Sequence, residues 1–576
     1  MKKILTGILL AAAVCSCEMD LFRSDTMTST QLKSDPSSAV YTTDGNYSMF
    51  KDILMYNSSI NPNNTYIRHW FQMAEFRGDN VTLSGRTEDP LYDAIAYADI
   101  PTSYNLGYFW YVSYKIIYGA NSNIEAIQEG ASVTSDQLLG ENYFLRAVCH
   151  LNLLQLYARP YSRGRDNLGV VLRNSTDCSE TKRATVGEVY EQIEKDLKKA
   201  ADLMKAGNAR GDKGYVSHEA ALGLLSRVYL HMGMNDECIA VCDELLGSDP
   251  SAHLDTDLDN YFANARTSKE TLWCIANDEN YDGYTRKGQI GSMYYSPDGI
   301  GSTGWCEMYF SDPLIELFNH FPEDKRLAAY FELCSPINDG KVAIHWPVND
   351  GLPYRANALV TDVTPNGDGT YNISYLNKNY VVKNKQVNGF TEYYIEGFAT
   401  DAVDDDDFTG GTRVFVRPNM SKGQSVRNTY PAYMMKKFTG ENGIPLFSSP
   451  VMIRYAEVVL NRAEAYAHKG DAAKALADVN IIRKRAGLTG DAEMTQANMG
   501  ARGYSDVLDV VLDERRLELC FEGFRPYDLY RNGRSINRKF AGVQTWETLD
   551  VAALDNVYPY CIPIDEINVS GIEQNR

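Results

Sequence analysis

Three glycines, Gly299, Gly301 and Gly304, have the spacing of a loop that binds the phosphates of a dinucleotide. Such a loop works between a buried strand and a helix, because the helix N-terminus attracts the phosphates. No strand–helix–strand pattern surrounds these glycines, and Pro313 would interrupt a helix soon after them. We therefore expect no nucleotide cofactor.

A second group, Asp255, Asp257 and Asp259, begins like the calcium-binding loop of an EF-hand. That loop needs a glycine at its sixth position and a glutamate at its twelfth. Asn260 and Arg266 occupy these two positions, so an EF-hand is excluded.

Zinc and hydrolytic chemistry have little support. His231, Cys238 and Cys242 could share one helical face only if the chain did not turn at Gly233. The sequence contains neither a nucleophile elbow nor a His-Glu-x-x-His motif. With 76 acidic residues, a pair of glycosidase carboxylates can always be imagined, so such a pair is no evidence. We expect no catalytic residues and no metal ligands from these motifs.

Aromatic residues are the remaining candidates, and the chain has 39 Tyr against 20 Phe. Tyr284, Tyr294, Tyr295 and Trp305 lie in a glycine-rich loop region, where an exposed ring has no core to enter. Flat rings stack on the apolar faces of sugars, so these four are predicted to bind ligand. The tryptophans on periodic or strand-like segments are assigned to the core: Trp70, Trp110 and Trp273.

The composition is that of a globular protein, with 44% hydrophobic and 23% charged residues. The formal charge of −20 argues against nucleic acid, because phosphate binding needs a basic face. Beyond Cys15 and Cys17, nine scattered cysteines remain, and an odd, scattered set is no disulfide framework. We expect most of them to be small buried packing residues.

The N-terminus resembles a lipoprotein signal. Lys2 and Lys3 precede an apolar run at residues 4–14, which is too short to span a bilayer. The prediction is a signal peptide at residues 1–16 and acylation of Cys17, with cleavage of an ordinary secreted protein nearby as the alternative. Nothing later in the chain approaches the roughly 18 apolar residues of a transmembrane helix.

Helix caps can be predicted directly. Thr134 with Gln137, and Thr185 with Glu188, have the spacing of capping boxes that open two helices. The first helix should end near Arg159, before a proline, and the second at Gly207.

Two distant helical hairpins share the spacing of a tetratricopeptide unit, with turns at Gly233 and Gly470. Cys238 then occupies the small-residue position where two helices touch. Because such hairpins cannot bury their faces alone, both are expected to stack in one superstructure. Residues 255–449 between them lose helical periodicity. There we expect irregular loops, an acidic turn at residues 404–407 and a small β-hairpin around Tyr371–Tyr375.

The chain resembles the SusD/RagB family through a set of charged and apolar motifs that covers nearly all of its mature length. The matching segments are Phe144–Ala147, Arg183–Thr185, Asp196–Leu197, Ala220–Tyr229, Arg454–Tyr466, Ala475–Asn480, Arg483–Leu488, Glu514–Arg525, Asp528–Arg531, Ile562–Ile567 and Gln574–Asn575. Charged residues in these motifs follow one another at three- or four-residue intervals, from Arg515 and Glu518 to Arg531. We interpret them as structural ion pairs.

The resemblance implies a mainly α fold, a tetratricopeptide-like helical superhelix with an irregular, loop-rich insertion that contains minor β-hairpins. The expected organisation is a signal peptide at residues 1–16, an N-terminal helical region at 17–254, a ligand-binding insertion at 255–449 and a C-terminal helical region at 450–576.

The resemblance also implies function. It predicts a lipid-anchored protein of the Gram-negative outer membrane, facing the exterior, that holds a glycan for a SusC-type TonB-dependent transporter and catalyses nothing. In such proteins, aromatic residues of an N-terminal loop join those of the insertion, and here that loop contributes Arg86, Tyr92, Tyr97 and Tyr104. A structural calcium ion can accompany the family fold, but no ligands for it can be assigned.

Two alternatives remain open. The RagB branch of the family implies oligopeptides as ligands, which would need backbone hydrogen-bonding groups more than stacking rings. A glycoside hydrolase would need a carboxylate pair in the insertion.

Overall fold

The computed structural model describes residues 38–61, 63–83, 92–205, 210–282, 290–296, 304–306, 308–334, 336–349, 356–398, 401–403, 408, 410–420, 433–542 and 544–575. Cys17, Arg86, Tyr284 and the predicted acidic turn at 404–407 lie outside these ranges. Within them, no helix is long and apolar enough to cross a membrane.

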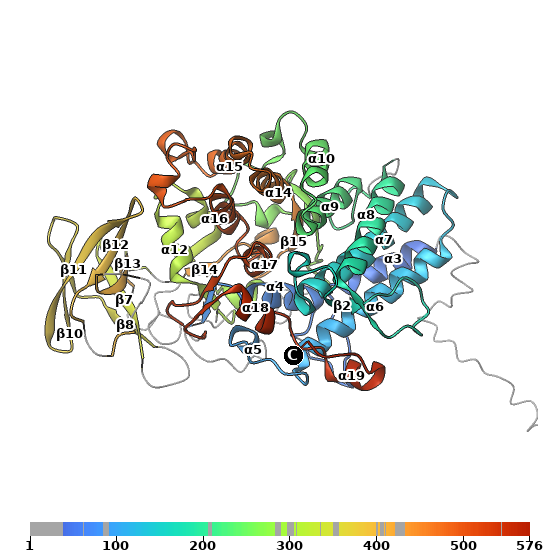
Figure 1. Ribbon diagram of the computed structural model, residues 1–576, viewed down its shortest axis with the longest axis horizontal. Helices are drawn as coiled ribbons and strands as arrows, with labels where there is room; N and C mark the ends of the chain where they lie inside the picture. Colours follow the sequence, from blue (N-terminus) through green and yellow to red (C-terminus); the bar gives the residue numbers. More distant parts are fainter. Residues whose placement is uncertain are drawn as a thin grey trace, which may run out of the picture.

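Helices form the centre and one side of the molecule, and a β-sheet lies at the opposite end (Figure 1). The mainly α fold predicted from the sequence is confirmed. The principal helices are α3 (Ser38–Ser48), α4 (Tyr66–Phe76), α6 (Tyr104–Ala126), α7 (Val133–Tyr157), α8 (Val186–Met204), α9 (His218–Met232), α10 (Asn235–Leu246), α12 (Asp312–Asn319), α13 (Lys325–Tyr330), α14 (Tyr455–His468), α15 (Ala472–Arg485), α16 (Val507–Leu519), α17 (Arg525–Arg531), α18 (Val551–Val557) and α19 (Ile564–Ser570).

One predicted cap is confirmed and the other is wrong. Thr185 and Glu188 form a reciprocal capping box at the start of α8. The N-cap of α7 is Ser132, whose side chain accepts a hydrogen bond from the Ser135 amide, and Thr134 lies inside the helix. Two hydroxyl residues lie close together here, and the earlier one satisfies the free backbone amides of the first turn.

The two predicted helical hairpins are α9–α10 and α14–α15, and they pack on each other through α10 and α14. Gly233 and Gly470 have left-handed φ angles of 72° and 76° at the turns, a conformation that glycine adopts without strain. Cys238 is fully buried, with its Sγ 3.4 Å from the Ser226 carbonyl oxygen and 3.8 Å from that of Asn461. A larger side chain at this position would push the two hairpins apart.

The main hydrophobic core runs through both helical regions, from Tyr47 near the N-terminus to Ile572 near the C-terminus, and smaller clusters lie beside it among the C-terminal helices. It contains Trp70, Trp110 and Trp273, as predicted, with exposed fractions of at most 4%. Strands β4 (Thr271–Cys274) and β15 (Val451–Arg454) pair antiparallel and join the start of the insertion to the C-terminal helices. The two hairpins therefore belong to one continuous scaffold.

The insertion contains a seven-stranded antiparallel sheet, which is larger than the expected hairpin. Its order is β8-β7-β13-β12-β11-β10-β9. The strands are β7 (Val342–Val348), β8 (Ala356–Val360), β9 (Val363–Pro365), β10 (Tyr371–Tyr375), β11 (Lys378–Val387), β12 (Phe390–Ile395) and β13 (Thr412–Pro418). The predicted hairpin is present as β9–β10.

A small separate core lies inside this sheet around Trp346, which is fully buried. The outer side of β11 is polar and exposed, so the pattern of buried residues along the chain is weak. In addition, β7 pairs with β13, about 70 residues later. Local periodicity cannot show a pairing of that kind, because only the folded chain brings the two strands together.

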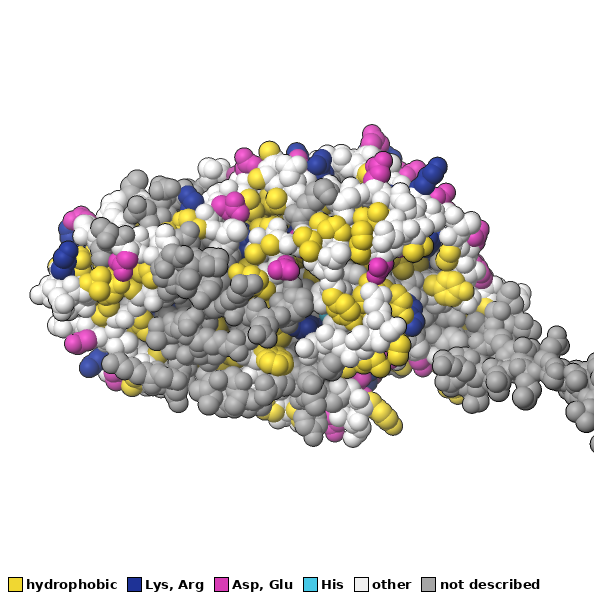
Figure 2. All heavy atoms as spheres, turned by 90° about the horizontal axis from the view of Figure 1, so that it is seen from below, with side chains coloured by type: hydrophobic (Ala, Val, Ile, Leu, Met, Phe, Trp, Pro, Cys, Tyr) yellow, Lys and Arg dark blue, Asp and Glu magenta, His cyan; other side chains and the backbone are white. Residues whose placement is uncertain are grey.

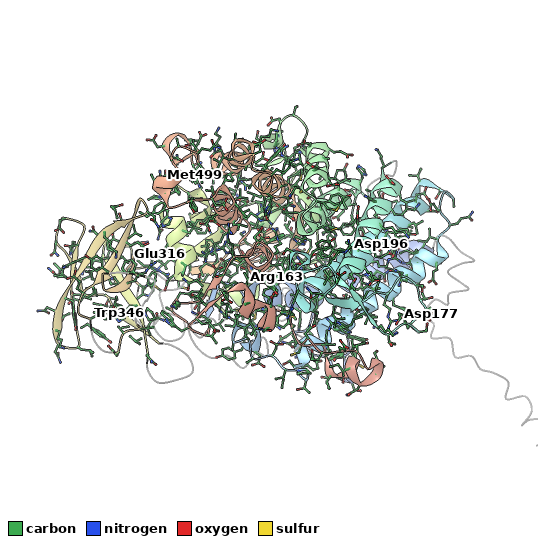
Figure 3. All side chains as sticks on the ribbon, viewed as in Figure 1. Arg163, Asp177, Asp196, Glu316, Trp346 and Met499 are labelled. Carbon is green, nitrogen blue, oxygen red and sulfur yellow. The ribbon has the colours of Figure 1, made fainter. Side chains whose placement is uncertain are left out.

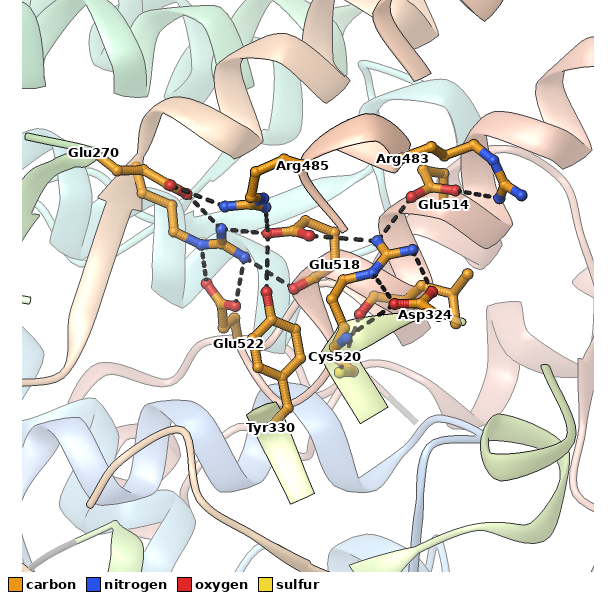
Figure 4. A network of polar contacts seen from close by, with 12 residues as sticks. Glu270, Asp324, Tyr330, Arg483, Arg485, Glu514, Glu518, Cys520 and Glu522 are labelled. Carbon is orange, nitrogen blue, oxygen red and sulfur yellow. Dashed lines mark hydrogen bonds and ion pairs between the residues drawn. The ribbon is translucent and has the colours of Figure 1, made fainter. Parts of the chain in front are cut away.

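A balanced ion network lies in the centre of the helical body (Figure 4). It joins five carboxylates, of Glu270, Asp324, Glu514, Glu518 and Glu522, to five cations, of Arg326, Lys437, Arg454, Arg483 and Arg485. Arg454 lies at the middle: its Nη1 is 2.6 Å from Glu518 and 2.8 Å from Glu270, and its Nη2 is 2.9 Å from Glu522. Burial by itself raises the pKa of Glu518. Arg485, Arg454 and Arg326 outweigh that effect and hold this pKa well below its usual range.

Other charged residues of the C-terminal motifs also form buried ion pairs, as interpreted from the sequence. Arg531 and Asp528 have the expected three-residue spacing, but most of the pairs join residues farther apart. Arg515 contacts Asp528 at 2.8 Å and Arg531 contacts Glu464 at 2.5 Å. Arg525 pairs with Asp79, 446 residues earlier, at 3.0 Å. These side chains thus connect elements that are distant in the sequence.

Replacing Arg454 by Met should destabilise the protein by about 3–5 kcal/mol, because three carboxylates would lose their shared partner inside the core. Urea unfolding followed by circular dichroism measures the change. The matched control is Arg165→Met, which removes a pair with Glu191 whose two side chains are each 55% exposed. The control should leave the unfolding midpoint unchanged, and an equal loss in both variants would contradict the central role of Arg454.

Glu75 on α4 should make stability fall as the pH rises. Burial, partly offset by hydrogen bonds from Asn80 (2.7 Å) and the Gly523 amide (3.1 Å), raises its pKa to about 7. The unfolded chain releases this proton near pH ~4.3. Between about pH 4.3 and 7, the folded state therefore holds a proton that the unfolded state has lost, and unfolding becomes easier with rising pH.

Glu75→Gln removes this ionisation. The free energy of unfolding of the variant minus that of the wild type should therefore increase from about pH 5 to pH 8. Urea titrations at both pH values measure the difference. Glu323→Gln, at an exposed position, serves as the control for the loss of a surface charge, and an equal change in both variants would contradict the assignment. A difference for Glu75→Gln that stays constant with pH would contradict the assignment.

Candidate ligand-binding surface

A two-stranded sheet brings together the ends of the two loops in which the sequence predicts a ligand site. Strand β1 (Val81–Leu83) pairs antiparallel with β5 (Met308–Phe310), and Leu83 lies opposite Met308. The N-terminal loop leaves this sheet after Leu83, and the insertion loop enters it just before Met308. The two segments, more than 200 residues apart in the chain, therefore meet at the same end of one sheet.

Trp305 lies next to this end and is held by backbone hydrogen bonds. Its amide donates to the Ser292 carbonyl oxygen at 2.7 Å, and the amide of Tyr295 donates to that of Gly291 at 2.9 Å, at the end of the short helix α11 (Gly291–Tyr294). Gly304 packs directly against the Tyr295 carbonyl group, where a Cβ atom would overlap the oxygen. The Trp305 ring is partly buried against the main core.

The two neighbouring tyrosines differ in environment. Tyr295 is partly buried, and its hydroxyl donates a hydrogen bond to Glu332 at 3.1 Å. Tyr294 is only 1% exposed, and its ring centroid lies 5.1 Å from that of Phe521. The sequence predicted an exposed ring at Tyr294, whereas the side chain is buried. The helical turn of α11 directs it into the core, and a glycine-rich sequence alone does not reveal that turn.

The three described residues that the sequence predicts in the N-terminal segment lie in different environments. Tyr97 donates a hydrogen bond to the Arg77 carbonyl oxygen at 2.5 Å, and the guanidinium groups of Arg77 and Arg538 lie over its ring at 5.2 and 4.6 Å. Tyr97 is therefore held within the structure. Tyr92 begins the short helix α5 (Tyr92–Ile95) and is partly buried. Tyr104 begins α6, and its ring lies 5.2 Å from that of Tyr56.

A polar cleft of about 470 Å³ separates α12 from strands β12 and β13. Figure 3 shows Glu316 on α12, on the side of the helix towards the sheet that contains Trp346. Burial raises the pKa of Glu316 to about 7, the range of a general acid. Arg413 lies 3.3 Å from Glu316 and 3.5 Å from Glu392, so one guanidinium bridges the two carboxylates.

Metal ligands do not cluster in the described part of the chain, where no group of three His, Cys, Asp or Glu side chains could hold an ion. Eight of the nine described cysteines are buried and all nine are free thiols, and only Cys178 among them is exposed.

Sequence reasoning missed a second group of rings, on α6. Tyr111 and Tyr118 line an open groove, and Tyr118 is 53% exposed. Their spacing indicates a helix face, which periodicity alone assigns to the core. The high tyrosine content is the signal that could have distinguished them, because a buried face is more often aliphatic.

Gly304→Ala should displace the turn that holds Trp305, because the new methyl group overlaps the Tyr295 carbonyl oxygen. Hydrogen exchange at the Trp305 amide should become faster, as its hydrogen bond to Ser292 is strained. The control is Gly45→Ala in α3, where no atom lies within 4 Å of the added carbon. Unchanged exchange at Trp305 in Gly304→Ala would show that the turn does not depend on this contact.

Comparison with known proteins agrees with this architecture. Residues 269–558 match a model described as the SusD family, and residues 37–230 match one described as "Starch-binding associating with outer membrane". SusD-like protein P2 of Formosa agariphila is 24% identical over 435 residues, which cover 73% of this chain and 71% of that protein. SusD-like protein P38 of the same organism is 23% identical and covers 81% and 80%.

Solved structures show the same fold. A SusD superfamily protein from Bacteroides thetaiotaomicron has a TM-score of 0.65 at 20% identity, with 94% of this chain and 99% of that chain covered. A laminarin-binding SusD-like protein has a TM-score of 0.57 at 19% identity, with 94% and 98% covered. The first family match spans half of the chain and lies on the helices that carry the ion network. This protein belongs to the SusD family.

Proposed function

We propose that the protein captures a glycan at the outer surface of a Gram-negative bacterium and delivers it, unaltered, to a SusC-type TonB-dependent transporter. In this proposal Cys17 carries the lipid that anchors the chain in the outer membrane. The observation that carries the proposal is the β1–β5 pair, which joins the two loop ends beside Trp305 and Tyr295.

Several findings support a glycan as the ligand. Trp and Tyr rings offer flat apolar faces for sugar C–H groups, and the Tyr295 hydroxyl and Glu332 carboxylate offer hydrogen-bonding groups nearby. One family match is described as starch-binding, and one similar structure binds laminarin. With a formal charge of −20, the chain repels anionic polymers, so a neutral glycan is the better partner.

A glycoside hydrolase is the second candidate, and the raised pKa of Glu316 favours it. Three carboxylates line that cleft: Arg413 engages Glu316 and Glu392, and Arg417 pairs with Asp312. A catalytic pair must keep one carboxylate free to face water or the anomeric carbon. Pure protein should therefore release no reducing ends from polysaccharides. If the wild-type protein did release reducing ends, and the Glu316→Gln variant did not, the hydrolase would be established instead.

Trp305→Ala should weaken polysaccharide binding at least about tenfold, a loss of ~1.4 kcal/mol, while the helical circular dichroism stays unchanged. Retardation in affinity gels containing neutral polysaccharides measures it, with calorimetry of glycans and peptides alongside. Tyr295→Ala should act in the same direction. Tyr294→Ala is unsuitable as a test, because a cavity at this buried ring would cost about 3–5 kcal/mol.

Tyr41→Ala provides the control, since Tyr41 is 74% exposed on α3, a helix that is not part of the β1–β5 pair. It should bind like wild type. Undiminished retardation of Trp305→Ala would refute the aromatic site, and calorimetric binding of peptides without glycans would favour the oligopeptide alternative.

A further inference from the structure

Helix α6 carries a second set of aromatic rings. Trp110, Tyr114 and Tyr118 recur every four residues, so they lie along one side of the helix, and Tyr111 lies beside them. This side faces the C-terminal helix α19, which lies next to α6 in Figure 1. Between the two helices is an open groove of about 730 Å³.

The groove lies on the lower side of the molecule in Figure 1, where α19 is drawn. Figure 2 shows that side directly, with hydrophobic side chains in patches between scattered acidic and basic ones. Trp110 forms the floor and is only 4% exposed, whereas Tyr118 is 53% exposed and Val569, on the rim, 87%. The rings of Tyr56 and Tyr111 are tilted by 33°, with their centroids 5.4 Å apart, so the two aromatic residues pack against each other in the groove.

Polar contacts fix the walls of this groove. The Tyr56 hydroxyl and the Asn57 amide both donate to Oδ2 of Asp565 at 3.1 Å. The Trp110 indole N–H donates to Glu566 at 3.1 Å. The Trp110 bond holds α19 against α6, and the two bonds to Asp565 hold α19 against the segment that contains Tyr56 and Asn57, so the rings are already in place before any ligand arrives.

The same contacts leave hydrogen-bonding capacity at the rim. Both bonds to Asp565 use Oδ2, and its Oδ1 accepts none from the described residues. Lys115 places its Nζ 3.3 Å from the Tyr111 hydroxyl at the exposed edge. The rim therefore offers an acceptor and donors a few ångströms from the ring faces.

We propose that this groove, defined by α6 and α19, is a second binding platform for a neutral oligosaccharide. Open aromatic faces with carboxylate and ammonium groups at their edge match the alternating C–H faces and hydroxyls of a pyranose chain. A docked protein helix would need aliphatic pockets, whereas Pro563 and Val569 are the aliphatic residues lining this groove. Asp565 and Glu566 face a single cation, Lys115, which disfavours an anionic polysaccharide.

The platform is separate from the Trp305 site, and a long glycan that reaches both would bind with higher avidity than either site provides. This inference does not rest on the proposed site at Trp305. Each site can be removed without the other, because they share no residues.

Fluorotyrosine NMR of the intact protein tests the platform, with the Tyr118 resonance assigned by comparison with Tyr118→Phe. Laminari-, malto-, xylo- and manno-oligosaccharides are the neutral probes, and polygalacturonate is the anionic one. At least one neutral series should shift the Tyr118 resonance in a saturable way, and polygalacturonate should not. The exposed Tyr41 serves as the internal control and should not move.

Two variants separate this site from the first. In Trp305→Ala the Tyr118 shift should persist with the same dissociation constant, and Tyr111→Ala should weaken it about tenfold. The platform is refuted if no neutral series shifts Tyr118, if polygalacturonate shifts it more strongly, or if Trp305→Ala abolishes the shift. Weaker but residual gel retardation in Trp305→Ala, with an intact Tyr118 shift, would support both sites.

Discussion

The buried ion network around Arg454 is the constraint on which the arrangement of this molecule depends. Its five carboxylates and five cations come from the residue before β4, from α13 and its N-cap, from Lys437 and the later strand β15, from α15, and from α16 with the residues that follow it. A charge in the core is stable only when its partners are present, so none of these segments can dock without the others. The network therefore ties the insertion to the C-terminal helices.

Apolar packing between the two helical hairpins fixes the scaffold together with the ion network. α10 packs on α14 at Cys238, and the common core extends from the first described helix to the C-terminal residues. With the scaffold fixed in this way, the seven-stranded sheet forms its own small core around Trp346 at one end of the molecule. It adds a polar cleft beside α12 without entering the main core.

Ligand recognition, as we propose it, uses the edges of this scaffold. Short elements such as β1, β5 and α11 position Trp305, and the long helix α6 together with the short helix α19 positions the groove beside Tyr118. In both places aromatic rings are held by hydrogen bonds from rigid elements. Pre-organised rings lose little conformational entropy on binding, which suits a protein that must capture a dilute ligand and release it.

The sequence by itself determined the helical class, the hairpin turns at Gly233 and Gly470, the capping box at Thr185 and the structural role of the C-terminal charges. These features depend on local conformation or on the need of a charged motif for a partner. The tertiary structure alone decided which partner each charge has, as with Arg525 and Asp79, and that β7 pairs with β13. It also decided that Tyr294 is buried while Tyr118 is exposed. Sequence periodicity indicates which residues share one side of a helix or strand. Only the packing of distant segments determines whether that side is covered or exposed.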